Sequence, residues 1–296
     1  MKAVYTLQDL KHASTDPDNI FYREDKPARL AVLGDPIAHS KSPELHQPAL
    51  DALALNCSYI RVHLTPEEFN EGVSLLQELG FIGCNCTVPH KERALAWTDQ
   101  PSKFAQQLGV ANTIHFADQT CYTTDPAGLE SAVNEDLGLD FAGKNVLILG
   151  AGGGAGSAVA QHLLRKPLNH LFLYNRTPEK LDDLYQHIIN LGDVDLTKLS
   201  LYGNDEYPNT QDIDLIINAT SLGLREDQPS PFPESLLLSH HHVYDMTYGC
   251  KNALAQACEA KGAQYADGLS MLRHQGAEAF KLWFPGTDPL PMMGLK

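Results

Sequence analysis

A lysine stands at an unusual place in the stretch NCTVPHKE, residues 85–92. The apolar run Phe81–Cys84 predicts a strand that Pro89 ends, and Lys91 follows two residues later. In open α/β sheets, ligands bind at the carboxyl ends of the strands. A lysine there can donate a proton and stabilise developing negative charge, or it can simply be a solvated residue at a helix start.

Further polar residues occupy the predicted ends of elements in the N-terminal half. Singly, each has a structural explanation, such as a helix cap at Ser42, a turn at Asn112 and a cap before Pro126 at Asp125. Together they predict a pocket rich in hydroxyl and amide groups, which suits a polyhydroxylated acid better than an apolar ligand. The residues are Ser40, Ser42, Asn85, Thr87, Lys91, Asn112 and Asp125.

The stretch NVLILGAGGGAGSAVAQHLL, residues 145–164, has the layout of a dinucleotide-binding turn between a strand and a helix. Gly150 would make the tight turn, Gly152 would let the backbone approach the pyrophosphate, and Ala155 would allow close helix–strand packing. The helix N-terminus can then bind the phosphates, so even an acidic protein can hold this anion. The candidate cofactor residues of the turn are Gly150, Gly152, Gly153, Gly154 and Ala155.

The next strand and its end, LFLYNRTPEK (171–180), indicate which nicotinamide cofactor binds. NAD-binding proteins commonly place an acidic residue there, which hydrogen-bonds the ribose 2′-hydroxyl. Here Asn175, Arg176, Thr177 and Lys180 supply donors and positive charge instead, which suits a 2′-phosphate. The sequence therefore predicts NADP as the cofactor.

Strands alternate with helices along most of the chain, which predicts an α/β fold with parallel sheets and two α/β domains. The first would cover residues 29–126, with a hairpin formed by 110–116 and 120–124. The second, 127–267, would be a Rossmann-type domain. Residues 1–28 are polar and interrupted by prolines, so we expect an N-terminal extension or a loosely packed helix.

Composition and charge exclude several classes of protein. A formal net charge of −15 disfavours nucleic-acid binding. No apolar run approaches the roughly 18 residues of a membrane helix, and the N-terminus lacks the apolar segment of a secretory signal. The six cysteines lack zinc-site spacing, so we expect reduced thiols, no metal and a cytoplasmic location.

Beyond these local patterns, the sequence resembles the shikimate dehydrogenase family, which includes quinate/shikimate dehydrogenases, from about residue 30 to 285. The matching stretches are GDPIAHSKSPELH, NCTVPHKE, ANT, TDPAG, LGAGGGAGSA, NRT, DLIINATSLG, YDMTYG and ADGLSMLRHQGAEAF. The resemblance implies an N-terminal catalytic, substrate-binding domain completed by a C-terminal helix within 268–296, an NADP-binding domain, and a cleft between them. It also implies reversible reduction of 3-dehydroshikimate to shikimate, a step of aromatic amino acid biosynthesis, by a monomer or homodimer with small-molecule ligands only.

The resemblance further assigns residues to roles. It implies a catalytic pair, for which we expect Lys91 to be the acid/base and Asp125 its orienting partner. Substrate contacts fall on Ser40, Ser42, Thr87, Asn112, Tyr248 and Gln275. Cofactor contacts fall on the glycine turn, on Asn175, Arg176 and Thr177, and on Met246, Gly268 and Met271.

Two departures from the family pattern leave alternatives open. Thr123 stands where the family usually has Asn, and Pro126 follows the aspartate where Gly is usual. The same scaffold can serve quinate or both substrates, although Ser42 and the NRT stretch favour shikimate and NADP. A non-catalytic NADP-binding homologue is the alternative from another class, and the retention of Lys91 and Asp125 argues against it.

Overall fold

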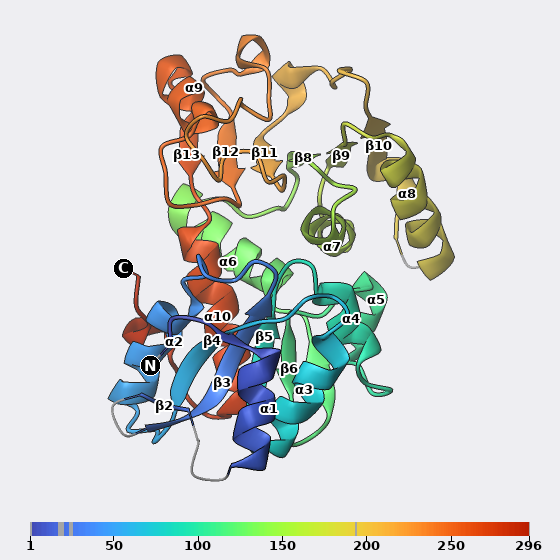
Figure 1. Ribbon diagram of the computed structural model, residues 1–296. Coiled ribbons are helices and arrows are strands. Elements are labelled where there is room, and N and C mark those ends of the chain that lie inside the picture. Colours follow the sequence, from blue (N-terminus) through green and yellow to red (C-terminus); the bar gives the residue numbers. More distant parts are fainter. Residues whose placement is uncertain (1, 17–20, 24–25, 193, 296) are drawn as a thin grey trace. The chain divides into compact units, whose positions relative to one another are not determined.

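The computed structural model describes residues 2–16, 21–23, 26–192 and 194–295 (Figure 1). Two compact units form, an N-terminal unit of Met1–Thr124 with Arg273–Lys296, and a second unit of Asp125–Leu272. The predicted α/β fold with two domains is confirmed. The division differs from the expected limits, because residues 125–126 and 268–272 belong to the second unit.

The N-terminal unit contains a mixed sheet whose path runs β1-β4-β3-β5-β6-β7, with β2 paired to β3. Strands β1, β4, β3 and β5 are parallel, and β6 and β7 form the predicted antiparallel hairpin. The strands are β1 (Tyr5–Thr6), β2 (Tyr22–Arg23), β3 (Lys26–Gly34), β4 (Ser58–His63), β5 (Gly83–Cys86), β6 (Thr113–His115) and β7 (Thr120–Tyr122).

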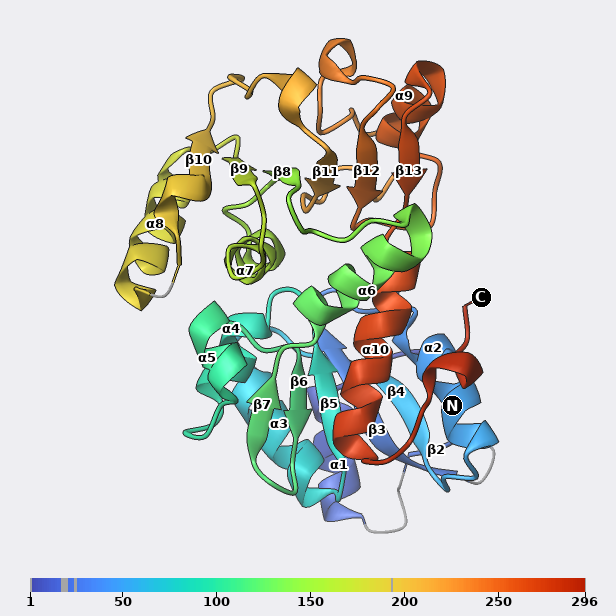
Figure 2. The same cartoon turned by 180° about the vertical axis from the view of Figure 1, so that it is seen from behind.

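Helices cover both faces of this sheet (Figures 1 and 2). Helices α1 (Leu7–Thr15) and α3 (Phe69–Glu78) lie side by side on one face. Helix α2 (Ser42–Ala52) and the part of α10 (Leu269–Trp283) that belongs to this unit lie on the other. Short helices α4 (Lys91–Ala96) and α5 (Lys103–Leu108) connect β5 to β6, and the turn η4 (Leu290–Met292) follows α10.

Residues 5–15 form a packed strand and helix, which differs from the expected loose N-terminal extension. Strand β1 pairs in parallel with β4, and α1 packs against α3. The side chains of Leu7, Leu10 and Ala13 are buried in the main core of the unit. Their three-residue spacing marks one apolar helix face, a signal that the polar composition of the segment concealed. Residues 1, 17–20 and 24–25 of the expected extension lie outside the described residues.

The second unit contains a six-stranded parallel sheet of order β10-β9-β8-β11-β12-β13. The strands are β8 (Asn145–Leu149), β9 (His170–Tyr174), β10 (Leu199–Tyr202), β11 (Leu215–Asn218), β12 (His242–Asp245) and β13 (Gln264–Ala266). Counted along the chain, this is the 3-2-1-4-5-6 order of the doubly wound dinucleotide-binding fold. The order reverses between β8 and β11, and ligands of such folds bind at that point.

Alternate residues of β8 supply two separate cores. Val146 and Ile148 pack with α6 (Asp125–Leu137), α7 (Gly154–Leu163) and α8 (Glu179–Leu191), whereas Leu147 and Leu149 pack with α9 (Ala253–Lys261). A strand buried on both faces explains why NVLIL is apolar without alternation. Short turns η1 (Leu196–Lys198), η2 (Thr210–Asp212) and η3 (Glu234–Leu236) connect the later strands.

His46 lies fully buried in an aromatic cluster between α2, β4 and α10. Its ring stacks on Tyr59, with centroids 4.6 Å apart and 1° between the planes, and it also contacts Phe280 and Trp283. Neither ring nitrogen has a hydrogen-bond partner among the described residues. Burial therefore lowers the pKa of His46 from 6.5 to about 3, because a charged imidazolium cannot be solvated there.

We expect acid to destabilise the protein through His46. Below pH 6.5 the unfolded chain binds a proton at this residue, whereas the folded chain binds it only near pH 3. Stability is thus lost as the pH falls through this window, by up to about 1.4 kcal/mol per pH unit. His46→Phe keeps the aromatic stack and should flatten the pH dependence of the unfolding free energy, measured by urea denaturation between about pH 7 and about pH 4.5. A slope equal to that of the wild type would contradict this account.

Candidate active site

The loops that follow β3 and β5 lie against each other at the carboxyl ends of these strands. A Cβ added at Gly34, the last residue of β3, would lie 2.8 Å from the methyl group of Thr87. The first loop carries Ser40 and enters α2 at Ser42, and the second continues from Thr87 to Lys91. The structure thus brings these four predicted residues to one edge of the sheet in the N-terminal unit.

The two serines at the start of α2 are held in a fixed loop. The Ser40 hydroxyl donates to Ser42 Oγ at 3.2 Å, and the Ser42 N–H donates back to Ser40 Oγ at 3.3 Å. Arg61 on β4 donates through Nε to the Ser40 carbonyl at 2.8 Å, and its guanidinium pairs with Glu44 at 2.6 Å. Both serines are buried, and these hydrogen bonds hold the loop at the start of α2.

Lys91 is the first residue of α4 and is half-buried. Its carbonyl accepts a hydrogen bond of 3.0 Å from the Ala111 N–H, which ties the start of α4 to the loop before β6. The preceding His90 is buried, and its Nε2 lies 2.8 Å from the Leu64 carbonyl. The backbone around Lys91 is therefore held from two sides.

Asn112 is the centre of a buried network of amides and hydroxyls in the N-terminal unit. Its Oδ1 accepts from the Thr124 N–H and from the Thr113 hydroxyl, each at 3.0 Å. Its Nδ2 donates to Thr124 Oγ1 at 2.9 Å and to Gln275 Oε1 at 3.3 Å. Two of the predicted substrate residues, Asn112 and Gln275, are thus in direct contact.

The network continues to Asn85 on β5 and to Tyr59 on β4, a residue that the sequence did not single out. Asn85 Nδ2 donates to Thr113 Oγ1 at 3.0 Å and to the Asn112 carbonyl at 3.2 Å. Asn85 Oδ1 accepts from the Tyr59 hydroxyl at 2.7 Å. Burial raises the pKa of Tyr59 well above its ordinary 10.0, so the phenol stays a neutral donor.

Asp125 and Tyr248 belong to the second unit. Asp125 is buried at the start of α6, and Tyr248 lies in the loop after β12. Thr123, one of the two departures from the family pattern, is buried, and its hydroxyl has no hydrogen-bond partner in the part of the chain that the structure describes.

The glycine turn follows β8 as predicted. Gly150 has a φ of 79°, which side chains disfavour, and an added Cβ would lie 2.7 Å from the methyl group of Thr220. Thr220 follows β11, so the turn lies where the strand order reverses. At Gly152 an added Cβ would lie 2.6 Å from Lys180 Cβ and 3.2 Å from Asn175 Cγ.

A close approach of helix α7 and the turn after β8 occurs at Gly156, next to the predicted Ala155. Ala155 is half-buried, whereas a Cβ at the buried Gly156 would lie 2.4 Å from the Gly150 carbonyl oxygen. Helix α7 begins at Gly154, which turns residue 156 toward the strand. A spacing rule could not distinguish these positions, because residues 154–156 are all small.

The predicted donors for a 2′-phosphate follow β9 at the protein surface. Asn175 Nδ2 donates to the Thr177 carbonyl at 2.8 Å, which holds the turn before α8. The side chains of Arg176, Thr177 and Lys180 are exposed. Since a Cβ at Gly152 would meet both Asn175 and Lys180, the glycine turn and these residues share one edge of the sheet.

The three further residues with an expected cofactor role gather at the carboxyl end of β12. A Cβ at Gly268 would lie 2.4 Å from the Met246 carbonyl oxygen, and the Gly268 N–H donates to the Thr247 carbonyl at 2.9 Å. The Met271 N–H donates to the Tyr244 hydroxyl at 3.2 Å. Met246, Gly268 and Met271 are therefore held close together.

Asp245, the last residue of β12, was missed by the sequence reasoning although it holds this region together. It is fully buried. The hydrogen-bond partners that the structure gives to its carboxylate are all donors, as an ionised carboxylate requires. They are Asn218 Nδ2 at 2.9 Å, the Thr247 N–H at 2.9 Å, the Thr247 hydroxyl at 2.8 Å, Asn252 Nδ2 at 2.9 Å and the Tyr265 hydroxyl at 3.2 Å. The carboxylate thereby fixes the loop that carries Met246 and Tyr248.

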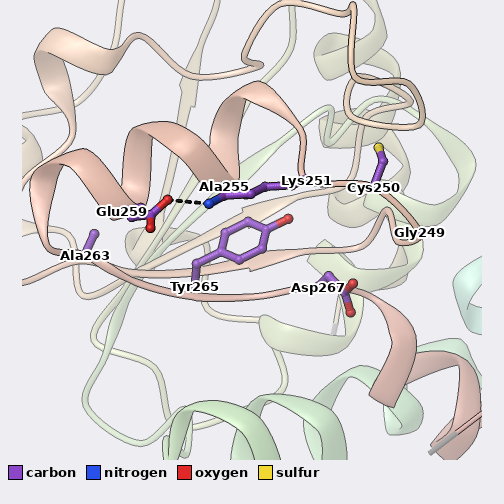
Figure 3. Close-up of a pocket in the computed structure, with 8 residues that line it drawn as sticks. All are labelled: Gly249, Cys250, Lys251, Ala255, Glu259, Ala263, Tyr265 and Asp267. Atoms are coloured by element: carbon purple, nitrogen blue, oxygen red, sulfur yellow. Dashed lines mark hydrogen bonds and ion pairs between the residues drawn. The ribbon is translucent and has the colours of Figure 1, made fainter.

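A separate hollow of about 530 Å³ lies beside α9 and β13 in the second unit (Figure 3). Tyr265 presents its ring to the hollow, and Lys251 forms an ion pair with Glu259 at its side. The lining residues are Gly249, Cys250, Lys251, Ala255, Glu259, Ala263, Tyr265 and Asp267. No predicted site residue is among them.

The described residues contain no group of three or more His, Cys, Asp or Glu side chains that could hold a metal ion. All six cysteines are free thiols. Within the described ranges, the helices are too short or too polar to cross a membrane.

The strand order and the glycine turn define a dinucleotide-binding α/β fold, and the N-terminal unit adds a buried polar network around Asn112. Residues 32–114 match the shikimate dehydrogenase substrate binding domain, and residues 132–223 match the shikimate / quinate 5-dehydrogenase family. The chain is 38% identical over 266 residues to a shikimate dehydrogenase (NADP(+)) from Rubrobacter xylanophilus, and the match covers 88% of this chain and 91% of that protein.

Solved structures agree with this result. A shikimate dehydrogenase in complex with NADP+ superposes with a TM-score of 0.82 at 29% identity, over 92% of this chain and 96% of that one. The shikimate 5-dehydrogenase of Thermus thermophilus in complex with NADP(H) and shikimate gives 0.76 at 33% identity, over 90% and 97%. The chain belongs to the shikimate dehydrogenase family of oxidoreductases, which confirms the resemblance seen in the sequence.

Two glycines of the turn make a matched pair of tests. Gly156→Ala should distort the turn, because its Cβ would lie 2.4 Å from a backbone oxygen, while a Cβ at Gly154 meets nothing within 4 Å. We expect Gly156→Ala to lower the free energy of unfolding by about 1–3 kcal/mol and to weaken NADP+ binding about tenfold or more. Gly154→Ala should preserve the free energy of unfolding, measured for both variants by urea denaturation, and NADP+ binding to Gly156→Ala is measured by titration calorimetry. Equal free energies of unfolding for the two variants would refute the assignment of Gly156.

Proposed function

We propose that this protein catalyses the reversible, NADP-dependent reduction of 3-dehydroshikimate to shikimate. The observation that carries the proposal is the buried hydroxyl and amide network around Asn112, in the same unit as the loops that bear Ser40, Thr87 and Lys91. Such donors and acceptors suit a ring with several hydroxyl groups and a carboxylate. Relatives of this chain are named for shikimate and NADP(+), which supports the same substrate and cofactor here.

We assign the proton chemistry to Lys91. NADPH, when bound, supplies the hydride, and negative charge then develops on the oxygen of the ketone. A lysine ammonium within hydrogen-bond reach of that oxygen stabilises the charge and donates the proton, and in the oxidative direction the amine takes the proton back. Asp125 is proposed as the carboxylate that orients Lys91.

The remaining residues are assigned to the substrate or to the cofactor. The substrate would be held by Ser40, Ser42, Thr87, Asn112, Gln275 and Tyr248. The backbone of the glycine turn and the start of α7 would bind the pyrophosphate. Arg176 and Lys180, with Asn175 and Thr177, would bind the 2′-phosphate, and Met246, Gly268 and Met271 would complete the cofactor site. We expect the enzyme to act in the cytoplasm as a monomer or a homodimer.

Quinate is the alternative substrate, because the family that matches residues 132–223 includes quinate dehydrogenases. A crossed assay separates the two. We expect an increase of nicotinamide absorbance with shikimate and NADP+, and at least about tenfold lower kcat/KM with quinate or with NAD+. Higher activity with quinate would overturn the choice of substrate, and higher activity with NAD+ would overturn the role of Arg176. Binding of NADP+ without any turnover would favour the non-catalytic homologue.

Replacing Lys91 tests the mechanism. Lys91→Ala should lower kcat by about 10²–10⁴-fold, because it removes the proton donor. The dissociation constant of NADP+ should stay within about twofold, since the glycine turn belongs to the other unit. Lys103→Ala is the matched control, because Lys103 also begins a short helix of the same unit but is exposed. Wild-type turnover by Lys91→Ala would eliminate Lys91 as the acid/base.

A further inference from the structure

The polar groups of the proposed substrate site form a continuous hydrogen-bonded chain, and three of its members are not among the predicted substrate contacts. The three are Tyr59, Asn85 and Thr113, and all are buried. In order, the chain consists of Tyr59, Asn85, Thr113, Asn112 and Gln275. All five residues belong to the N-terminal unit.

Two backbone groups fix how the asparagine amides in this chain are turned. A carbonyl only accepts, so the nitrogen of the Asn85 amide must face the Asn112 carbonyl, at 3.2 Å. A backbone N–H only donates, so the oxygen of the Asn112 amide must face the Thr124 N–H, at 3.0 Å. Turning either amide over would place two donors or two acceptors against each other, which is costly in a buried site.

The direction of each remaining bond follows from these two anchors. Asn85 Oδ1 is an acceptor, so Tyr59 must donate its hydroxyl hydrogen, at 2.7 Å. Thr113 Oγ1 accepts from Asn85, so its own hydrogen goes to Asn112 Oδ1. Asn112 Nδ2 donates to Gln275 Oε1, and the NH₂ group of Gln275 is therefore turned away from Asn112.

We propose that Tyr59 and Thr113 are positioning residues that fix the orientation of the Asn112 and Gln275 amides, and with it the pattern of donors and acceptors offered to the substrate. This inference rests on the proposed function, because it takes Asn112 and Gln275 as substrate contacts. Amides that cannot turn over discriminate between ligands, since a ligand with a misplaced hydroxyl leaves a buried polar atom unpaired.

Tyr59 is suited to this role because the rest of the residue is held independently of its hydroxyl. Its ring stacks on His46 at 4.6 Å, and its backbone N–H donates to Gln47 Oε1 at 3.1 Å. Tyr59→Phe therefore removes the donor and keeps the packing. Thr113→Val removes the next donor at nearly constant volume.

The test compares the two single variants, their combination and a control. We expect Tyr59→Phe and Thr113→Val each to raise KM for shikimate about tenfold, to keep kcat within about threefold, and to leave KM for NADP+ unchanged. The ratio of kcat/KM for shikimate over quinate should fall. The double variant should be little worse than either single one, because both interrupt the same chain. Tyr122→Phe is the control, since its hydroxyl donates to Asp118 at the hairpin and takes part in none of the bonds of the chain.

Three results would overturn the inference. The first is an unchanged KM in Tyr59→Phe with only a lower thermal midpoint, which would mean a purely structural role. The second is a set of effects that add up in the double variant. The third needs no turnover: side-chain amide hydrogens of Asn85 and Asn112, followed by NMR, should exchange faster with water in Tyr59→Phe than in the wild type, and equal exchange would exclude the chain. Absence of wild-type activity on shikimate and quinate would instead refute the proposed function alone.

Discussion

The hydrogen bond from the Thr124 N–H to Asn112 Oδ1 is the contact on which the orientation of the Asn112 network in the N-terminal unit depends. Because a backbone amide can only donate, this one bond decides which end of the Asn112 side chain faces the hairpin and which faces Gln275. A site built from flexible hydroxyls alone could adjust to many ligands. Here the backbone at the end of β7 determines which atoms of the polar side chains from β4, β5 and α10 act as hydrogen-bond donors and which act as acceptors.

In the second unit, a carboxylate rather than a series of neutral groups holds the loops at the strand ends. Parallel strands end together, and the loops that leave them carry unpaired backbone and side-chain groups that need partners. At the end of β12, the Asp245 carboxylate gathers donors from β11, from the following loop and from β13. One buried anion surrounded by donors holds several loops at once, whereas the N-terminal unit needs a series of neutral groups. The two arrangements place the residues proposed to contact ligands on rigid supports, without a disulfide or a metal site among the described residues.

Sequence reasoning succeeded where local chemistry determines the structure. The turn at Gly150 and the donors after β9 could be placed because each depends on residues adjacent in the chain. It failed where the deciding partner is distant. Tyr59 looks like any strand residue until Asn85 lies opposite its hydroxyl, and Asp245 looks like a strand-end acid until the ends of β11 and β13 surround it. Gly156 was missed for another reason: the helix starts at Gly154, one residue earlier than expected, and the backbone of Gly156 lies against the Gly150 carbonyl.

Strand β1 gives the N-terminal residues a protective role for the rest of the sheet. It is short, and among the described strands it pairs with β4, which would otherwise be an edge strand with free N–H and C=O groups. Helix α1 follows directly and covers apolar side chains of α3 beside that edge. Removing the first fifteen residues would thus uncover both a template for strand addition and an apolar surface. We therefore expect chains trimmed by proteolysis at this segment to self-associate through the uncovered strand and surface.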